Sequence, residues 1–300
     1  MNWTGVIPAI TTPINEDGAV DLDFLGRHAL WLVENGCSAL VALGSLGEGA
    51  TLSRDEKVAI LQSCVRALRG RAPVAAGISA LSTAEAVWLA QAAREAGCGG
   101  LMVLPPYVYS TDWREMKAHV KTVMESTDLP CLLYNNPVAY QTDFLPAQIQ
   151  ELCVEVPQLA AVKESSGEVR RIEELHELLG DRVTLLIGLD DLVLQGVQAG
   201  ARGWIAGVAN ALPRESVALF HAAVSGQSGL SLALFDWLLP LLRMDTVPKF
   251  VQLIKLMQAE VGMGSPRVRA PRLQLTGGEL AKAQAVIRGA LACRPALAPH

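Results

Sequence analysis

The sequence predicts a (β/α)8 barrel, the TIM-barrel fold, with additional C-terminal helices. Three observations lead to this prediction. Short apolar runs alternate eight times with longer amphipathic stretches between Gly5 and residue 225. Each run is apolar throughout, which is typical of parallel strands buried on both faces. A barrel of this kind occupies roughly 250 residues, and the chain has 300.

The predicted strands all have the length of a buried strand and lack the alternation of a half-exposed sheet. A doubly wound parallel sheet is the main alternative, and it normally carries a G-x-G-x-x-G turn after its first strand. This chain has Thr11-Thr12-Pro13 at that point, so the barrel is favoured. The eight runs begin near Gly5, Ser38, Pro73, Gly100, Pro130, Leu159, Val183 and Gly203.

The stretches between the strands carry helix start and stop signals. Ser53 is followed by Glu56, and Ser82 by Glu85, so both segments predict a reciprocal capping box at a helix N-terminus. Three glycines that follow amphipathic stretches predict helix C-caps. They are Gly36, Gly97 and Gly180.

The C-terminal part of the chain contains no further strand signal. We expect residues 1–225 to form the catalytic barrel and residues 226–300 a helical extension. Three helices are expected in the extension, at about 228–242, 246–261 and 277–292.

The composition argues against several classes of protein. A net charge of −5 disfavours a nucleic-acid or anionic-membrane surface, which needs clustered lysine and arginine. No uncharged apolar run reaches about 18 residues, so we expect no membrane span. The first residues lack the basic and apolar segments of a secretion signal, and we expect a cytoplasmic protein.

Cysteine and histidine positions predict neither a disulfide framework nor a metal site. The six cysteines form no CxxC pair and the five histidines no HxxxH pair. Most of the cysteines fall in apolar runs, where a free thiol behaves as a small hydrophobic group.

One lysine has the position of a catalytic nucleophile. Of seven lysines, only Lys163 ends an apolar strand, and active sites of βα barrels lie at the C-terminal ends of the strands. Burial there would lower the pKa of the amine and free it to attack a carbonyl. The alternative is a structural ion pair with a carboxylate such as Glu164.

The tyrosines cluster near this lysine. All four, Tyr107, Tyr109, Tyr134 and Tyr140, lie at or just beyond the ends of two neighbouring strands. Tyr134 ends the strand before the one that Lys163 ends, and a phenol there can move protons during Schiff-base chemistry. The alternative is an aromatic lid that only packs.

A glycine-rich loop follows the second predicted strand. The segment GSLGEG (44–49) can turn tightly and present backbone N–H groups to a carboxylate or phosphate. Its glycine spacing does not match a dinucleotide fingerprint, and such a loop can also be only a turn. We expect Glu48 to hold the loop by accepting hydrogen bonds from backbone N–H groups.

Five motifs in order carry a family resemblance. GSLGE (44–48), YNNP (134–137), VKES (162–165), GLDD (188–191) and GWIAGVAN (203–210) resemble the dihydrodipicolinate synthase and N-acetylneuraminate lyase family of class I aldolases. The resemblance implies a barrel with C-terminal helices, usually a homotetramer built as a dimer of dimers. It also implies a Schiff base between a lysine and a 2-oxo acid, without metal or organic cofactor.

The resemblance implies roles for individual residues. Lys163 matches the Schiff-base lysine and Tyr134 the tyrosine that transfers protons. Ser45 and Leu46 match the pair whose backbone N–H groups hold the substrate carboxylate. Gly188 and Ile205 match positions whose backbone carbonyls line the pocket.

The chain departs from the synthase pattern at three positions. Leu46 stands where most relatives carry a hydroxyl residue. Ala139 stands where synthases carry an arginine for the carboxylate of aspartate semialdehyde, and Val108 replaces a relay tyrosine that reaches the neighbouring subunit. Tyr107 and Tyr109 flank Val108 and are candidates for a relay or a lid. These departures disfavour 4-hydroxy-tetrahydrodipicolinate synthase activity.

One branch of the family fits better. GSLGE, YNNPVAY, KESS followed by RRI (170–172), GLDDL and MDTVPKFVQLIKL resemble 1-pyrroline-4-hydroxy-2-carboxylate deaminases of hydroxyproline catabolism. We therefore expect this cyclic imino acid to be converted to 2-oxoglutarate semialdehyde and ammonia. We expect a small apolar pocket lining that suits this compact ring. Its residues are Leu46, Val108, Val138 and Ala139.

Other functions remain open at this point. A 2-keto-3-deoxy-sugar-acid dehydratase or aldolase would use the same Lys163 and Tyr134, although a sugar acid needs more hydroxyl partners. A non-catalytic barrel that binds a small acid is disfavoured, because it would have no use for both residues together with the glycine-rich loop.

Overall fold

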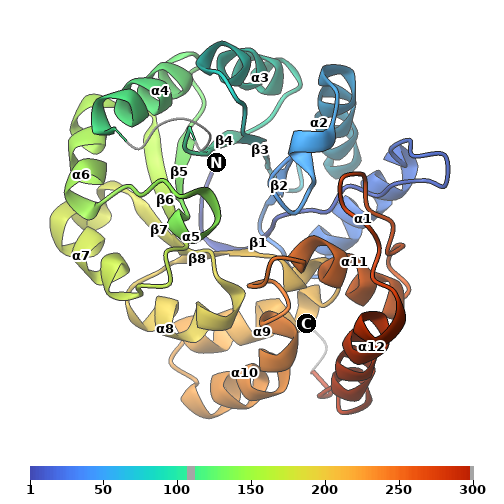
Figure 1. The fold of residues 1–300 in the computed structure, drawn as a ribbon. Coiled ribbons are helices and arrows are strands. Elements are labelled where there is room, and N and C mark those ends of the chain that lie inside the picture. Colours follow the sequence, from blue (N-terminus) through green and yellow to red (C-terminus); the bar gives the residue numbers. More distant parts are fainter. Residues whose placement is uncertain (107–111, 298–300) are drawn as a thin grey trace.

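The computed structural model describes residues 1–106 and 112–297. Eight parallel strands form one sheet at the centre, and helices surround it (Figure 1). Each strand lies within a run predicted from the sequence. The strands are β1 (Gly5–Pro8), β2 (Leu40–Ala42), β3 (Val74–Ile78), β4 (Gly100–Val103), β5 (Cys131–Asn135), β6 (Leu159–Glu164), β7 (Thr184–Ile187) and β8 (Gly203–Ala206).

The sheet closes on itself. Its strand order is β1-β8-β7-β6-β5-β4-β3-β2, and backbone hydrogen bonds join the two outer strands. Ser38 N donates to Val6 O, and Ile10 N to Val41 O, each at 2.9 Å. The predicted (β/α)8 barrel is thus confirmed, and the doubly wound alternative is wrong.

Side chains of each strand alternate between two apolar layers. On β6, Ala161 belongs to a cluster inside the barrel, whereas Val162 packs in the larger cluster between the sheet and the helices. Because side chains of a strand alternate with period two, Lys163 points inward with Ala161. Burial on both faces explains why the strand runs are apolar throughout.

The helices between the strands begin and end close to the predicted signals. The Ser53 capping box is reciprocal, as predicted. The second one is only half formed, because the Glu85 carboxylate accepts a hydrogen bond from Arg54 instead of from the Ser82 backbone. The barrel helices are α1 (Leu22–Glu34), α2 (Arg54–Leu68), α3 (Thr83–Glu95), α4 (Trp113–Glu125), α5 (Pro137–Tyr140), α6 (Pro146–Glu155), α7 (Arg170–Leu179), α8 (Val193–Gln198) and α9 (Pro213–Val224).

Three helices follow the barrel, as the sequence predicts. They are α10 (Ser228–Leu242), α11 (Phe250–Glu260) and α12 (Gly277–Ala292), and they pack beside α9 and α1 (Figure 1). The second helix begins at Phe250 rather than near residue 246. Pro248 accounts for the difference, since the residue before a proline is disfavoured in the helical conformation.

A buried ion pair joins this extension to the glycine-rich loop. Lys255 of α11 donates to Glu48 Oε1 at 2.5 Å, and both side chains are buried. The other carboxylate oxygen accepts the Arg269 backbone N–H at 2.9 Å. The expectation that Glu48 accepts a backbone N–H is therefore correct, but the donor belongs to the C-terminal segment and not to the loop.

Within the described ranges, no helix is long and apolar enough to cross a membrane. The same residues contain no group of three or more histidine, cysteine or acidic side chains placed to hold a metal ion.

The buried pair gives a stability prediction. Lys255→Met leaves the Glu48 charge buried without its partner, and removing one member of such a pair costs about 3–5 kcal/mol of unfolding free energy. The double variant Lys255→Met/Glu48→Gln should lose less, because no charge stays buried. Urea unfolding measures both.

The exposed pair Lys249–Glu279 supplies the control. Lys249→Met should change stability by less than about 1 kcal/mol. A loss for Lys255→Met no larger than this control would contradict the prediction.

Candidate active site

The candidate nucleophile and proton carrier lie side by side at the C-terminal end of the barrel. Tyr134 of β5 and Lys163 of β6 are paired in register. The Lys163 Nζ atom lies 3.9 Å from the centroid of the Tyr134 ring, and both side chains are about 6% exposed. The structure thus brings together the two residues that the sequence placed on neighbouring strand ends.

Burial sets the charge state of the lysine. It lowers the pKa of the Lys163 amine to about 8, although the carboxylates of Asp245 and Asp190 oppose the shift. No ion pair of Lys163 occurs among the described residues. The neighbouring Glu164 faces the other way and accepts hydrogen bonds from Asn135 Nδ2 and Ser166 N. The alternative of a structural Lys163–Glu164 pair is therefore wrong.

The predicted pocket-lining residues flank the lysine. Gly188 directly follows β7, and a Cβ atom there would lie 2.2 Å from Lys163 Cε, so only glycine leaves room for the side chain. Ile205 lies on β8 and belongs to the same interior cluster as Tyr134. Their positions fit the pocket-lining roles that the resemblance implies.

Tyr134 has the properties of a proton donor. Burial raises the pKa of its phenol to about 12, so the hydroxyl is protonated at neutral pH. Its oxygen accepts a hydrogen bond from Asn136 Nδ2 at 3.0 Å. The ring contacts Tyr140 edge to face, with centroids 5.7 Å apart.

The glycine-rich loop reaches the same place through its first hydroxyl. Ser45 Oγ and the Tyr140 hydroxyl form a hydrogen bond, which the sequence did not reveal because the two residues are 95 positions apart. Leu46 is buried. The N–H groups of Ser45 and Leu46 donate to no acceptor within the described parts of the chain, which suits the predicted capture of a carboxylate.

Two predicted site residues, Tyr107 and Tyr109, lie outside the described residues, as does Val108. The remaining expected lining is only partly present. Leu46 is buried, but Val138 on α5 is 71% exposed and Ala139 is exposed as well. The expectation that these two close an apolar lining is wrong for the single chain, because both side chains are exposed.

Sequence reasoning assigned no role to a buried carboxylate beside the lysine. Asp190 follows β7 and accepts hydrogen bonds from Trp204 Nε1 and Val208 N, both at 2.8 Å, and from Gly207 N. Burial raises the pKa of Asp190 to about 6, and these N–H donors limit the shift. Asp190 is therefore an anion at neutral pH, and its charge acts on Lys163. The only signal for it was its place in the GLDD motif.

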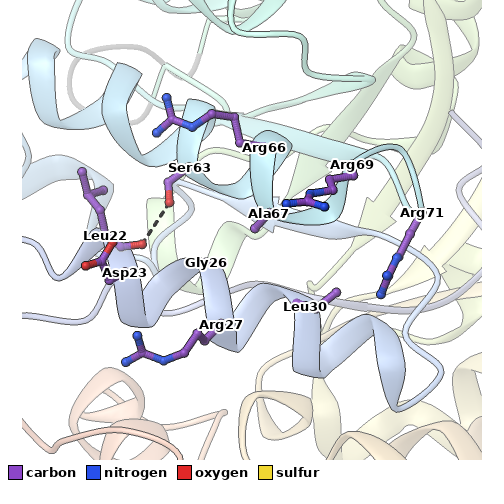
Figure 2. Close-up of a pocket in the computed structure, with 10 residues that line it drawn as sticks. All are labelled: Leu22, Asp23, Gly26, Arg27, Leu30, Ser63, Arg66, Ala67, Arg69 and Arg71. Carbon is purple, nitrogen blue, oxygen red and sulfur yellow. Dashed lines mark hydrogen bonds between the residues drawn. The ribbon is translucent and has the colours of Figure 1, made fainter.

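A surface hollow elsewhere does not compete with this site. It has a volume of about 520 Å³, lies between α1 and α2, and is lined by several arginines (Figure 2). Its serine, Ser63, donates to the backbone oxygen of Leu22 at 3.0 Å. The hollow lies on the outer wall of the barrel, whereas Lys163 is inside, so we place the chemistry at the strand ends.

Comparison with known proteins identifies the family. Residues 2–290 match the Dihydrodipicolinate synthetase family. The chain belongs to this family. It is 33% identical to 4-hydroxy-tetrahydrodipicolinate synthase of Neisseria gonorrhoeae over 284 residues, covering 95% of this chain and 97% of that one. It is 29% identical to the enzyme of the same name from Desulforamulus reducens, covering 93% of this chain and 95% of that one.

Solved structures agree with this assignment. Dihydrodipicolinate synthase from Aquifex aeolicus superposes with a TM-score of 0.91 at 30% identity, covering 96% of this chain and 98% of that one. A prophage protein of the dihydrodipicolinic acid synthase family from E. coli K12, solved in complex with pyruvate, gives 0.92 at 26% identity, covering 98% and 100%. The family resemblance is confirmed, and the protein is an enzyme of this lyase family.

Lys163 should be the residue that forms a covalent adduct. Borohydride added with pyruvate should reduce a Schiff base and add mass to the peptide that contains Lys163, and Lys163→Ala should abolish this labelling. Because the free amine is the nucleophile, labelling should become faster as the pH rises through about 8, the pKa of the amine. Labelling of Lys249 or Lys255 instead would overturn the assignment.

Tyr134→Phe should separate proton transfer from packing. The change removes one hydroxyl, and a positioned proton carrier contributes about 10²–10⁴-fold to a rate. We expect kcat to fall within that range while borohydride trapping at Lys163 persists. Steady-state kinetics and peptide mass measure the two effects, and a kcat close to that of the unaltered protein would mean that Tyr134 only packs.

Proposed function

We propose that the protein is a Schiff-base deaminase that converts 1-pyrroline-4-hydroxy-2-carboxylate to 2-oxoglutarate semialdehyde and ammonia. The buried Lys163 amine against the Tyr134 phenol supports the Schiff-base chemistry. The observation that supports this choice of substrate is the residue at position 139. Ala139 offers a methyl group where a synthase needs a cation to bind a second carboxylate. We further propose a cytoplasmic homotetramer.

The first half of the reaction opens the ring. The neutral Lys163 amine adds to C2, the electrophilic carbon of the cyclic imine. The C2–N bond of the ring then breaks, and the nitrogen leaves as a primary amine on C5 with a proton from Tyr134. A protein-bound iminium remains at C2. The free N–H groups of Ser45 and Leu46 are placed to hold the C1 carboxylate.

The second half removes the hydroxyl and the amine. The iminium acidifies C3–H, and loss of that proton gives an enamine that expels the C4 hydroxyl. Tautomerisation moves the unsaturation to C4–C5 and produces an imine, which water hydrolyses to the aldehyde and ammonia. Hydrolysis at C2 then releases Lys163. No step requires a metal or an organic cofactor.

A 2-keto-3-deoxy-sugar-acid dehydratase or aldolase is the second candidate. Such an enzyme would form the same Schiff base at Lys163, and a dehydratase acting on a pentonate would give the same product. The pyruvate complex of the E. coli K12 relative supports 2-oxo acids as ligands in this family. An extended sugar acid would need several hydroxyl partners, whereas the compact pyrroline ring carries a single hydroxyl.

Ammonia release is the decisive test. Purified protein should release ammonia from 1-pyrroline-4-hydroxy-2-carboxylate with a kcat in the usual enzyme range of about 1–10³ s⁻¹, and Lys163→Ala should release none. Pyruvate with aspartate semialdehyde, and 2-keto-3-deoxy-pentonate, are assayed in parallel. Condensation of pyruvate with aspartate semialdehyde without ammonia release from the pyrroline would show that the deaminase proposal is wrong.

The variant Ala139→Arg is matched to this comparison. Because position 139 is exposed, the arginine should change stability by no more than about 0.5 kcal/mol. It should leave ammonia release close to that of the unaltered protein. It should raise any condensation with aspartate semialdehyde, since a guanidinium can hold that carboxylate through two hydrogen bonds.

A further inference from the structure

A second carboxyl group reaches the barrel mouth from the C-terminal extension. Asp245 lies between α10 and α11, and its side chain lies against Gly207, the first residue after β8. A Cβ atom on Gly207 would lie 2.0 Å from Asp245 Oδ1. Glycine at 207 therefore allows the carboxyl group to approach the C-terminal edge of the strands, the edge at which Lys163 lies.

The carboxyl group of Asp245 is in electrostatic contact with the catalytic pair. When Asp245 is ionised, its charge raises the pKa of Lys163 and of Tyr134. In the strand order, β6 with Lys163 lies between β5 on one side and β7 and β8 on the other. Tyr134 thus flanks the lysine from the β5 side and Asp245 from the β8 side. A substrate joined to Lys163 would therefore have Tyr134 on one side and Asp245 on the other.

Asp245 differs from its neighbour Asp190 in one decisive respect. Three N–H groups satisfy the carboxylate of Asp190. The Oδ1 atom of Asp245 is buried and has no hydrogen-bond partner among residues 1–106 and 112–297. A buried polar atom without a partner costs free energy, so its position calls for a ligand.

Burial favours the neutral form of the Asp245 carboxyl group. Burial raises its pKa well above the ordinary value, and the anion of Asp190 raises it further, while Lys163 opposes the shift. Two neighbouring carboxyl groups whose pKa values are pushed apart commonly divide the roles of acid and anion. The N–H donors favour the anion at Asp190, and burial without such donors favours the neutral acid at Asp245.

We propose that Asp245 is a catalytic residue that donates the proton with which the C4 hydroxyl of the substrate leaves as water; this inference rests on the proposed deaminase function. In the step, the nitrogen lone pair of the enamine re-forms the C2 iminium. The C2=C3 pair becomes the C3=C4 bond, and the C4–O pair leaves with oxygen. That oxygen takes the Asp245 proton, and the carboxylate is reprotonated by water before the next turnover.

The test compares Asp245→Asn with the unaltered protein. The amide keeps the shape but cannot supply the proton, so kcat for ammonia release should fall about 10²–10⁴-fold. Borohydride trapping at Lys163 should persist, and the trapped adduct should keep its C4 oxygen, one water heavier than the dehydrated adduct. Trapping with 1-pyrroline-2-carboxylate, which has no C4 hydroxyl, should be equal in both proteins.

Asp191→Asn is the matched control, because the charge of Asp191 also acts on Asp245 but no proton donor is lost. Its kcat should stay close to that of the unaltered protein.

The pH profile adds a second readout. Lys163, Asp190 and Asp191 are the charged groups that act on Asp245. The kcat of the unaltered protein should fall as rising pH ionises Asp245, and Asp245→Asn should lack this limb.

The outcomes separate the two proposals. The role of Asp245 is overturned if Asp245→Asn releases ammonia with an undiminished kcat, or if Asp191→Asn loses as much kcat as Asp245→Asn. Either result leaves the proposed deaminase function standing. If the unaltered protein releases no ammonia, the deaminase proposal fails, and Asp245 is judged on dehydration of 2-keto-3-deoxy-pentonate, which also expels a C4 hydroxyl. Inactivity on both substrates overturns both proposals.

Discussion

The desolvation of one amine governs this site. An ammonium group on Lys163 would lose most of its hydration inside the barrel, and the shift of its pKa from 10.5 to about 8 corresponds to about 3 kcal/mol against the charged form. The surrounding residues set the equilibrium between the charged and the neutral amine. The apolar interior removes water, the face of Tyr134 partly compensates the charge, and the glycine at 188 leaves the side chain its space.

In the proposed reaction a positive charge returns to this nitrogen, and the strand ends provide a counter-charge for it. Asp190 is held by backbone and indole N–H groups, which keep it ionised despite its burial. A fixed anion near Lys163 stabilises an iminium more than a neutral amine. The same anion raises the pKa of Asp245. One buried charge would therefore favour the proposed covalent intermediate, and it also raises the pKa of the neighbouring Asp245.

Local patterns in the sequence were sufficient to predict the strands and the proximity of Lys163 and Tyr134. Both faces of each barrel strand are buried, so the strands appear as apolar runs in the sequence. Lys163 ends one of these runs, at the C-terminal edge where barrel enzymes have their active sites. Contacts between distant segments could not be read in this way. The pairing of Glu48 with Lys255 spans 207 positions, and the competition of Arg54 for Glu85 weakened a capping box that looked complete. The exposure of Val138 depended on the direction of a one-turn helix.

The Glu48–Lys255 pair also bears on how the chain becomes active during synthesis. The loop after β2 emerges from the ribosome early, but the cation that neutralises Glu48 lies on α11. Until α11 has emerged and docked, this carboxylate has no counter-charge, and the loop that carries Ser45 lacks its contact with the extension. The eight strands can be complete while the site at their ends is not. The contact that fixes this loop against the extension therefore forms only when nearly the whole chain is present.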